Sequence, residues 1–257
     1  MNTLYLTMQL FSTIKKVIVH ILTSHIAATL IKSVYGRFIP FFNVKIDVSD
    51  MVVSEREITH IFWRIYEKAE VRLIRKYYDG SMPVVELGSS IGVISSLLGK
   101  MKKPEVPLFC IEANEQLIPT LTSNLQVNQV QNYQILHKAV GPKDEASVYF
   151  SFAPSSLNSK ISKASTDISV DTINLIDFVE DQKLNDFFLI CDIEGAEIYI
   201  IEEQIDFFTK CTIAVIELHN ITHEGKYYSR EMLNEMILKK TDFALAEQYR
   251  HVYVYKR

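Results

Sequence analysis

Acidic side chains end three apolar segments of this chain, and they are the residues whose type and position could do chemistry. Glu86 follows two valines, Glu112 follows Leu-Phe-Cys-Ile, and Asp192 follows Phe-Phe-Leu-Ile-Cys. Short apolar runs of this kind are typical of buried strands. Because the carboxyl ends of parallel strands face the ligand crevice of an α/β sheet, we expect all three acids to meet a bound ligand.

The first acid is followed by a turn that contains two glycines. Gly88 and Gly92 stand four residues apart, and the amphipathic run 94–98 comes after them. This pattern predicts a buried strand that turns directly into a helix, whose free N–H groups point into the crevice. A dinucleotide-binding turn has three glycines, but Ser90 and Val93 occupy the second and third positions here, so a pyrophosphate would fit poorly. The acid before the turn can instead attract a cation such as a sulfonium-bearing amino acid.

The second acid, Glu112, ends the next strand along the chain. In dinucleotide-binding folds an acid at this separation from the glycine turn accepts hydrogen bonds from both hydroxyls of a ribose. The turn and the acid together predict a site for adenosine without a pyrophosphate. Two structural alternatives stay open: Gly88 and Gly92 could serve only tight strand–helix packing, and Glu112 alone could be a solvated strand end.

The third acid begins a cluster of titratable residues. Glu194 and Glu197 follow Asp192 closely, and the next apolar strand ends in Glu217 and then His219. Neighbouring carboxylates raise one another's proton affinity, which suits one of them to act as a general base. We assign Asp192 as the base or as a substrate-positioning acid, with Glu194, Glu217 and His219 as supporting candidates. The structural alternatives are an N-cap role for Asp192, a helix-dipole role for Glu197 and a hydrogen-bonded core role for His219.

Length and composition limit the architecture that positions these residues. At 257 residues, with 48% hydrophobic and 23% charged side chains, the chain suits one α/β domain with a large core and an additional N-terminal segment. Its net charge of −4 and the lack of a long basic run argue against a nucleic-acid partner. Cys110, Cys191 and Cys211 lie in apolar runs without C-x-x-C spacing, so we expect reduced core thiols, a cytoplasmic location and no metal site.

The N-terminal segment, 1–53, is expected to be a helical and irregular extension of a main domain at 54–257. Its stretch 17–31 carries no formal charge but is too short to span a membrane comfortably. We expect helices packed on the domain or on a second subunit of a homo-oligomer. A signal or interfacial anchor, with peripheral contact at the inner face of the membrane, stays open. Aromatic residues, Gly and Pro around 35–50 predict an irregular connection.

Periodicity and turn signals place the remaining elements. Helices are expected at 54–77, where Ser-Glu-Arg-Glu resembles a capping box, and at 117–127, 171–181 and 229–240. An antiparallel strand is expected at 148–150, a mobile loop near the crevice at 151–166, and a closing antiparallel pair at 243–246 and 252–255.

Five motifs, in order, resemble one protein family. They are V-V-E-L-G-S-S-I-G, F-C-I-E-A-N, H-K-A-V-G, I-C-D-I-E-G-A-E and V-I-E-L-H, within about 83–219. Each alone is weakly specific, but their order and spacing resemble the FkbM family of S-adenosylmethionine-dependent methyltransferases. The resemblance implies the Rossmann-like class I methyltransferase fold: an α/β architecture with a seven-stranded, mostly parallel sheet, an antiparallel last strand and strand order 3-2-1-4-5-7-6. It also implies O-methylation of a sugar hydroxyl in a glycan, glycolipid or related natural product, as in polysaccharide biosynthesis.

The resemblance further implies roles for individual residues. It assigns the methionine end of S-adenosylmethionine to the first turn, its ribose to Glu112, and its adenine to the second turn and the 137–139 edge. The residues assigned to the cofactor are Glu86, Gly88, Ser89, Ser90, Gly92, Glu112, Ala113, Asn114 and Ala139. At positions 86, 89 and 90 the family usually has Asp, a small residue and Asn, so the chain keeps charge and size there. At Ile190 it departs further, because the family commonly has Lys beside the acid.

Two other functions stay open from the sequence alone. The same fold could methylate RNA or protein, which the net charge and the lack of an N-P-P-Y-like motif disfavour. It could also bind the cofactor in an assembly without catalysis, which Ile190 would permit. The expected partner is a small-molecule or glycan acceptor with a free hydroxyl.

Overall fold

The computed structural model describes residues 22–152, 159–162 and 168–257 of the chain. The chain divides into two compact units, one ending at Tyr66 and the other running from Glu67 to Arg257. The domain boundary expected between residues 53 and 54 stays a prediction. Among the described residues, no helix has both the length and the apolar character needed to cross a membrane.

The first unit contains a β-hairpin and two helices. Its elements are α2 (His25–Tyr35), β1 (Phe38–Phe41), β2 (Val44–Asp47) and α3 (Glu55–Phe62). The irregular connection expected at 35–50 is wrong, because β1 and β2 pair as an antiparallel hairpin. Phe42 lies in its tight turn with φ of +50°, a left-handed conformation that aromatic residues rarely adopt. Pro40 is tolerated because the hairpin is only two strands wide.

The helix expected at 54–77 is interrupted in the structure. It begins at the predicted capping box, but α3 ends at Phe62 and α4 (Lys68–Tyr77) is a separate helix. Arg64 and Glu67 lie between them with φ of +57° and +43°. Left-handed residues cannot continue a right-handed helix, so the chain breaks here.

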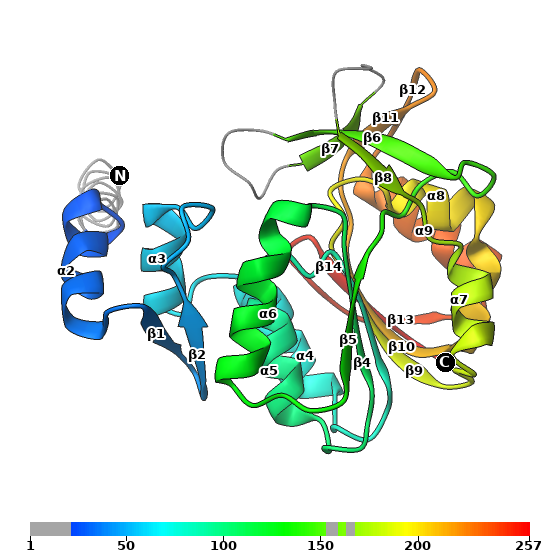
Figure 1. Ribbon diagram of the computed structural model, residues 1–257. Coiled ribbons are helices and arrows are strands. Elements are labelled where there is room, and N and C mark those ends of the chain that lie inside the picture. Colours follow the sequence, from blue (N-terminus) through cyan, green and yellow to red (C-terminus); the bar gives the residue numbers. More distant parts are fainter. Residues whose placement is uncertain (1–21, 153–158, 163–167) are drawn as a thin grey trace, which may run out of the picture. The chain divides into compact units, whose positions relative to one another are not determined.

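The second unit is built on a seven-stranded sheet (Figure 1). Its strands are β3 (Val84–Leu87), β4 (Leu108–Glu112), β5 (Tyr133–His137), β9 (Phe187–Cys191), β10 (Cys211–Glu217), β13 (Ala244–Tyr249) and β14 (Val252–Lys256). They lie side by side in the order β5-β4-β3-β9-β10-β14-β13. All neighbours are parallel except at β14, which is antiparallel to β10 and β13. Numbered along the chain this order is 3-2-1-4-5-7-6, which confirms the expectation from the sequence.

Helices cover both faces of this sheet (Figure 1). One face carries α4, α5 (Val93–Met101) and α6 (Ile118–Val127). The 3-10 turn η1 (Glu115–Leu117) directly precedes α6. The other face carries α7 (Leu175–Asp181), α8 (Glu197–Glu203) and α9 (Arg230–Lys240), with the 3-10 helix η2 (Ile205–Lys210). Side chains alternate along a strand. On β3, Val85 and Leu87 therefore join the core shared with α7, α8 and α9, whereas Glu86 points to the opposite face and contacts Ser95 of α5.

Shorter strands are added to the second unit. They are β6 (Ser147–Phe152), paired with β7 (Ser159–Ser162) and β8 (Ile168–Asp171), and the hairpin of β11 (Ile221–His223) and β12 (Lys226–Tyr228). β6 confirms the antiparallel strand expected at 148–150. The loop expected at 151–166 is wrong at 159–162, which form β7, while 153–158 and 163–166 lie outside the described residues.

In two helices, a capping side chain determines the residue at which the helix begins. The helix expected at 171–181 begins only at Leu175, because the Asn174 side chain accepts the N–H groups of the first turn while Asp171 still pairs in β8. The helix expected at 229–240 is confirmed as α9, with Ser229 as its N-cap.

Candidate functional site

Strand register brings the acidic residues to one face at the carboxyl edge of the sheet. Ile190 of β9 lies between Glu86 of β3 and Val215 of β10, so these three side chains form one row. Residues two positions apart on a strand share a face. Asp192 and Glu217 therefore follow Ile190 and Val215 on the same face, which α4 and α5 cover.

The turn between β3 and α5 has the strand-to-helix form that the sequence predicts. Gly88 and Gly92 have φ of +85° and +80°, which strains any residue with a side chain. A Cβ on Gly88 would lie 1.8 Å from the carbonyl oxygen of Asp192, and one on Gly92 would lie 2.5 Å from Cδ1 of Leu121. Both glycines are therefore needed where two parts of the chain come close together. Gly88 allows the ends of β3 and β9 to approach each other.

Glu86 lies behind this turn and is almost fully buried. Its Oε2 accepts hydrogen bonds from the hydroxyls of Ser89, at 3.2 Å, and Ser95, at 2.5 Å. Burial raises the pKa of the Glu86 carboxyl to about 7, although these hydrogen bonds partly offset the effect. The Glu86 carboxyl thus links the turn to α5, and its pKa lies near neutral pH.

Glu112 joins the first turn to the turn after β4. Its Oε2 accepts the N–H of Ser90, and its Oε1 accepts the N–H of Asn114, both at 2.7 Å. Burial raises the pKa of Glu112, against the opposing effect of these backbone hydrogen bonds. Ser90 has φ of +50°, and its buried hydroxyl oxygen has no hydrogen-bond partner. The Glu112 carboxylate therefore links the two turns through their backbone N–H groups.

The other residues assigned to the adenine side lie beside Glu112. His137 Nε2 is 3.0 Å from the carbonyl oxygen of Ala113. Ala113 packs against the small cluster that contains Ala139, and Ala139 forms a bridge with Thr172. The structure thus brings Ser90, Glu112, Ala113, Asn114 and Ala139 to neighbouring strand ends.

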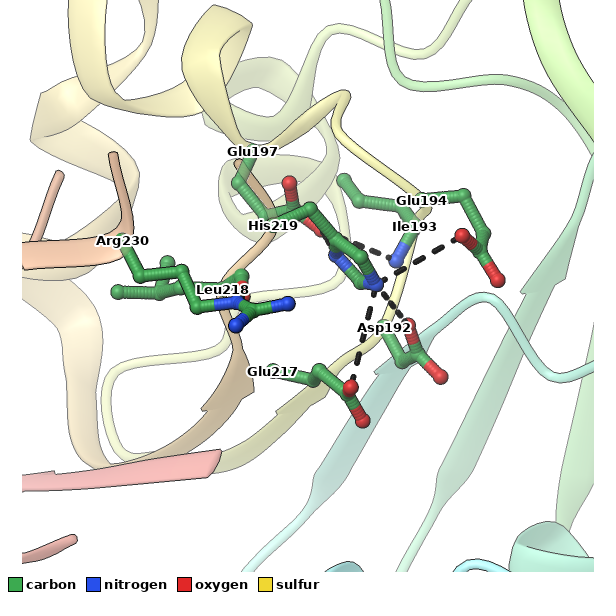
Figure 2. A network of polar contacts seen from close by, with 8 residues as sticks. All are labelled: Asp192, Ile193, Glu194, Glu197, Glu217, Leu218, His219 and Arg230. Carbon is green, nitrogen blue, oxygen red and sulfur yellow. Dashed lines mark hydrogen bonds and ion pairs between the residues drawn. The ribbon is translucent and has the colours of Figure 1, made fainter. Parts of the chain in front are cut away.

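A histidine stands at the centre of the carboxylates that follow β9 and β10 (Figure 2). The Nε2 atom of His219 lies 3.6 Å from Glu194, 3.8 Å from Asp192 and 4.0 Å from Glu217. Its Nδ1 atom lies 3.1 Å from Oε1 of Glu197, a nearly inaccessible carboxylate. Oε1 of Glu197 also accepts the N–H of Ile193, at 3.3 Å. The carboxylate that orients the His219 ring is therefore itself fixed by a backbone hydrogen bond.

These distances decide two of the structural alternatives. Asp192 is not the N-cap of the following helix, because α8 begins after Ala196 and no side chain caps it. Glu197 lies in the first turn of α8, as expected, but its carboxylate is turned inward to orient His219. The three carboxylate candidates for proton transfer, Asp192, Glu194 and Glu217, each lie within ion-pair distance of the fourth candidate, His219.

The cluster holds fewer positive charges than negative ones, and this shifts its titrations. Burial lowers the pKa of His219, but the hydrogen bond to Glu197 and the neighbouring carboxylates outweigh this effect and raise it to about 9. Burial and the charge of Glu217 raise the pKa of Asp192 well above its ordinary value. The neighbouring charges and burial therefore favour the protonated forms of both His219 and Asp192.

Two acidic residues of this cluster were not predicted from the sequence. Glu67 precedes α4, and Glu70 lies in its first turn, in line with buried Leu73 and Ile74. Burial raises the pKa of Glu67 to about 8, with further effects from Asp192 and Glu217. Burial and contact with Glu217 raise the pKa of Glu70 to about 10. The available signal was an acid within the apolar stripe of a predicted helix.

The chain matches the family model described as the methyltransferase FkbM domain, over residues 86–251. It belongs to the FkbM methyltransferase family. The resemblance seen in the five sequence motifs is thus confirmed, and the protein is an S-adenosylmethionine-dependent methyltransferase. The glycine turn, Glu112 and the stretch from Asp192 to His219 lie within the matched residues, whereas Glu67 and Glu70 precede them.

Two solved structures that this FkbM methyltransferase matches have low sequence identity to it. A methyltransferase from Pyrococcus furiosus is 11% identical and has a TM-score of 0.47, with 90% of this chain and 96% of that chain covered. A SAM-dependent methyltransferase from Aquifex aeolicus is 10% identical and has a TM-score of 0.42, with 72% and 86% covered. No curated protein sequence matches the chain. The class I fold is therefore assigned from the family and from the strand order 3-2-1-4-5-7-6.

Proposed function

We propose that this FkbM methyltransferase transfers the methyl group of S-adenosylmethionine to a hydroxyl of a sugar, in a glycan, glycolipid or related natural product. The observation that carries the proposal is the placement of Asp192. Its backbone packs on Gly88 of the cofactor turn, and its side chain enters the acid–histidine cluster. An alcohol needs such a base, because its oxygen is a weak nucleophile while it is protonated.

The residues at the strand ends fit S-adenosylmethionine. The Gly88–Gly92 turn with Glu86 would hold the methionine end, Glu112 the ribose hydroxyls, and Ala113, Asn114 and Ala139 the adenine. The buried, unpartnered hydroxyl of Ser90 beside Glu112 supports this assignment, because buried polar atoms normally have a partner. Bound S-adenosylmethionine supplies a methyl group activated by its positively charged sulfur.

The protein's own contribution would be alignment and proton transfer. Asp192 Oδ1 is buried and has no hydrogen-bond partner, so it is free to accept a proton from an acceptor hydroxyl. His219 lies beside it in an orientation set by Glu197, which favours a charged imidazolium that stabilises the carboxylates. Glu194 and Glu217 are the alternative proton acceptors in this arrangement.

We place this reaction in the cytoplasm. All three cysteines, Cys110, Cys191 and Cys211, are buried and unpaired, which is typical of proteins kept in a reducing compartment. Peripheral membrane contact and self-association of the N-terminal unit remain part of this proposal and are tested by vesicle sedimentation and by light scattering.

The experiment that tests the proposal separates turnover from cofactor binding. Purified protein is incubated with labelled S-adenosylmethionine and a panel of nucleotide sugars, glycans and glycolipids, and S-adenosylhomocysteine binding is measured by calorimetry. We expect micromolar binding of about −8 kcal/mol. Asp192→Asn should lower turnover by ~10²–10⁴-fold, because it removes the base, while leaving cofactor affinity unchanged.

A second pair of variants tests cofactor binding: the first variant should weaken it, and the second is the control. Glu112→Ala should weaken S-adenosylhomocysteine binding by at least ~10-fold, because a hydrogen-bonded carboxylate is lost from the ribose site. Glu115→Ala, three residues along and exposed, should bind as the wild type does. Full turnover by Asp192→Asn, or label found on nitrogen rather than on a sugar oxygen, would contradict the proposal.

A further inference from the structure

Four carboxylates converge on the α4 side of the candidate site. Glu67, Asp192 and Glu217 each offer one oxygen, and these three oxygens lie within 4.8 Å of one another. The Glu70 carboxyl reaches Glu217 from the first turn of α4. Glu67 and Glu70 come from the start of α4, and Asp192 and Glu217 come from the carboxyl ends of β9 and β10. Like charges held this closely repel one another strongly unless protons or a cation neutralise them.

Two buried oxygen atoms in this group have no protein partner. Glu70 is only 5% exposed, and its Oε1 accepts no hydrogen bond; Asp192 Oδ1 is likewise buried without a hydrogen-bond donor. A buried carboxylate oxygen without a donor is unfavourable, so each such atom in a native protein needs an explanation. Among the described ion pairs, His219 Nε2 contacts Asp192 and Glu217 only at 3.8 and 4.0 Å.

We propose that Glu67, Asp192 and Glu217 bind a hard divalent cation of the Mg²⁺ or Mn²⁺ class. The Glu70 carboxyl contacts Glu217 and helps to position it. Carboxylate oxygens are the ligands that these ions prefer, and Mg²⁺ commonly uses few protein carboxylates and fills its remaining positions with water or substrate oxygen. No metal-ligand spacing is visible along the chain, because the proposed ligands come from three separate elements.

A second group at the same site, Asp192, Glu197 and His219, is also close enough to hold a metal. Glu197 Oε1 already accepts the N–H of Ile193 and contacts His219 Nδ1, so only its buried, unpartnered Oε2 would be available to a metal. The all-carboxylate group lacks such a competing backbone bond among the described contacts. The geometry thus favours oxygen-only coordination beside the histidine.

The use of the cation in catalysis rests on the proposed function, whereas its binding does not. A cation at this position would orient the acceptor by its oxygen atoms and lower the pKa of a bound hydroxyl. Vicinal sugar hydroxyls, which present two oxygens, suit such a site. A cation at this site would therefore favour acceptors that carry two neighbouring hydroxyl groups.

The test measures Mn²⁺ binding to the full chain without cofactor or acceptor, by electron paramagnetic resonance and calorimetry. We expect one Mn²⁺ per chain in the wild type, displaced by Mg²⁺. Glu67→Gln and Glu217→Gln should each weaken binding by ~10–100-fold, because a charged ligand is lost. Glu235→Gln, an exposed acid on α9, is the matched control and should bind as the wild type does.

Thermal unfolding provides a second readout that a misfolded variant cannot imitate. In EDTA, Glu217→Gln should unfold at a higher temperature than the wild type, since repulsion is relieved, and Mn²⁺ should stabilise the wild type but not the variant. The inference would be overturned if the wild-type protein bound no Mn²⁺, or if Glu67→Gln and Glu217→Gln bound Mn²⁺ as tightly as the wild type does. The acids would then only share protons. Mn²⁺ binding without sugar methylation would instead remove only the proposed function.

Discussion

Glu86 places an ionisable group inside the apolar face of the sheet, and its neighbours explain its titration. Ile190 lies beside it in register, at the position where the FkbM family commonly has Lys. Because isoleucine brings no positive charge, hydrogen bonds from Ser95, Ser89 and Cys110 offset the burial of the carboxylate only in part. The pKa of Glu86 is accordingly raised to about 7 from 4.5.

This shift predicts how stability depends on pH. The folded protein keeps a proton on Glu86 that the unfolded chain has lost, so the free energy of unfolding falls as pH rises from about 4.5 to about 7. Glu86→Gln removes this titration and keeps an acceptor for both serines. Its stability relative to the wild type should rise by ~3 kcal/mol between pH 4.5 and 7.5. Urea denaturation across this range measures the difference, and a constant difference would show that Glu86 ionises normally.

At the scale of elements, local chemistry was predictable from the sequence and long-range placement was not. The β3–α5 turn follows from two glycines and an acid within seven residues, so it was predicted together with Glu112. The break between α3 and α4 was missed, because it depends on left-handed Arg64 and Glu67, residue types that carry no turn signal. The same break sets the start of α4 and so brings Glu67 to the site, which is why that acid was missed too.

The β3–α5 turn should tolerate no side chain at Gly88. Gly88→Ala adds left-handed strain and a Cβ 1.8 Å from the Asp192 carbonyl oxygen, so we expect a loss of ~3 kcal/mol or more in unfolding free energy. Gly225, with φ of +78° and nothing within 4 Å of an added Cβ, is the matched control. Gly225→Ala should lose only ~1 kcal/mol, which is the conformational part alone. Equal losses in urea denaturation would mean that the β9 contact does not require the glycine.

At the scale of the second unit, one core ties the site to distant strands. The helices α7 to α9 and η2 share a continuous apolar cluster with β3, β4, β9, β10 and β14. An aromatic series crosses it from Phe187 through Phe207, Phe208 and Phe243 to Tyr255, with ring centroids 5.2 to 5.8 Å apart. Since Asp192 directly follows β9 and Glu217 is the last residue of β10, the packing that fixes these strands also fixes the spacing of the two carboxylates.

Phe208 is the test of that coupling, because it contacts both Phe207 and Phe243 and is only 2% exposed. Phe208→Ala should lower the free energy of unfolding by ~3–5 kcal/mol, since it removes a buried ring and leaves a cavity. Tyr227→Ala, on a ring that is 57% exposed, should change it by less than ~1 kcal/mol. Hydrogen exchange should show the loss in β9, β10 and β14 together, because these strands share the core. A loss confined to η2 would mean that the aromatic series does not transmit stability to the strands that carry the site.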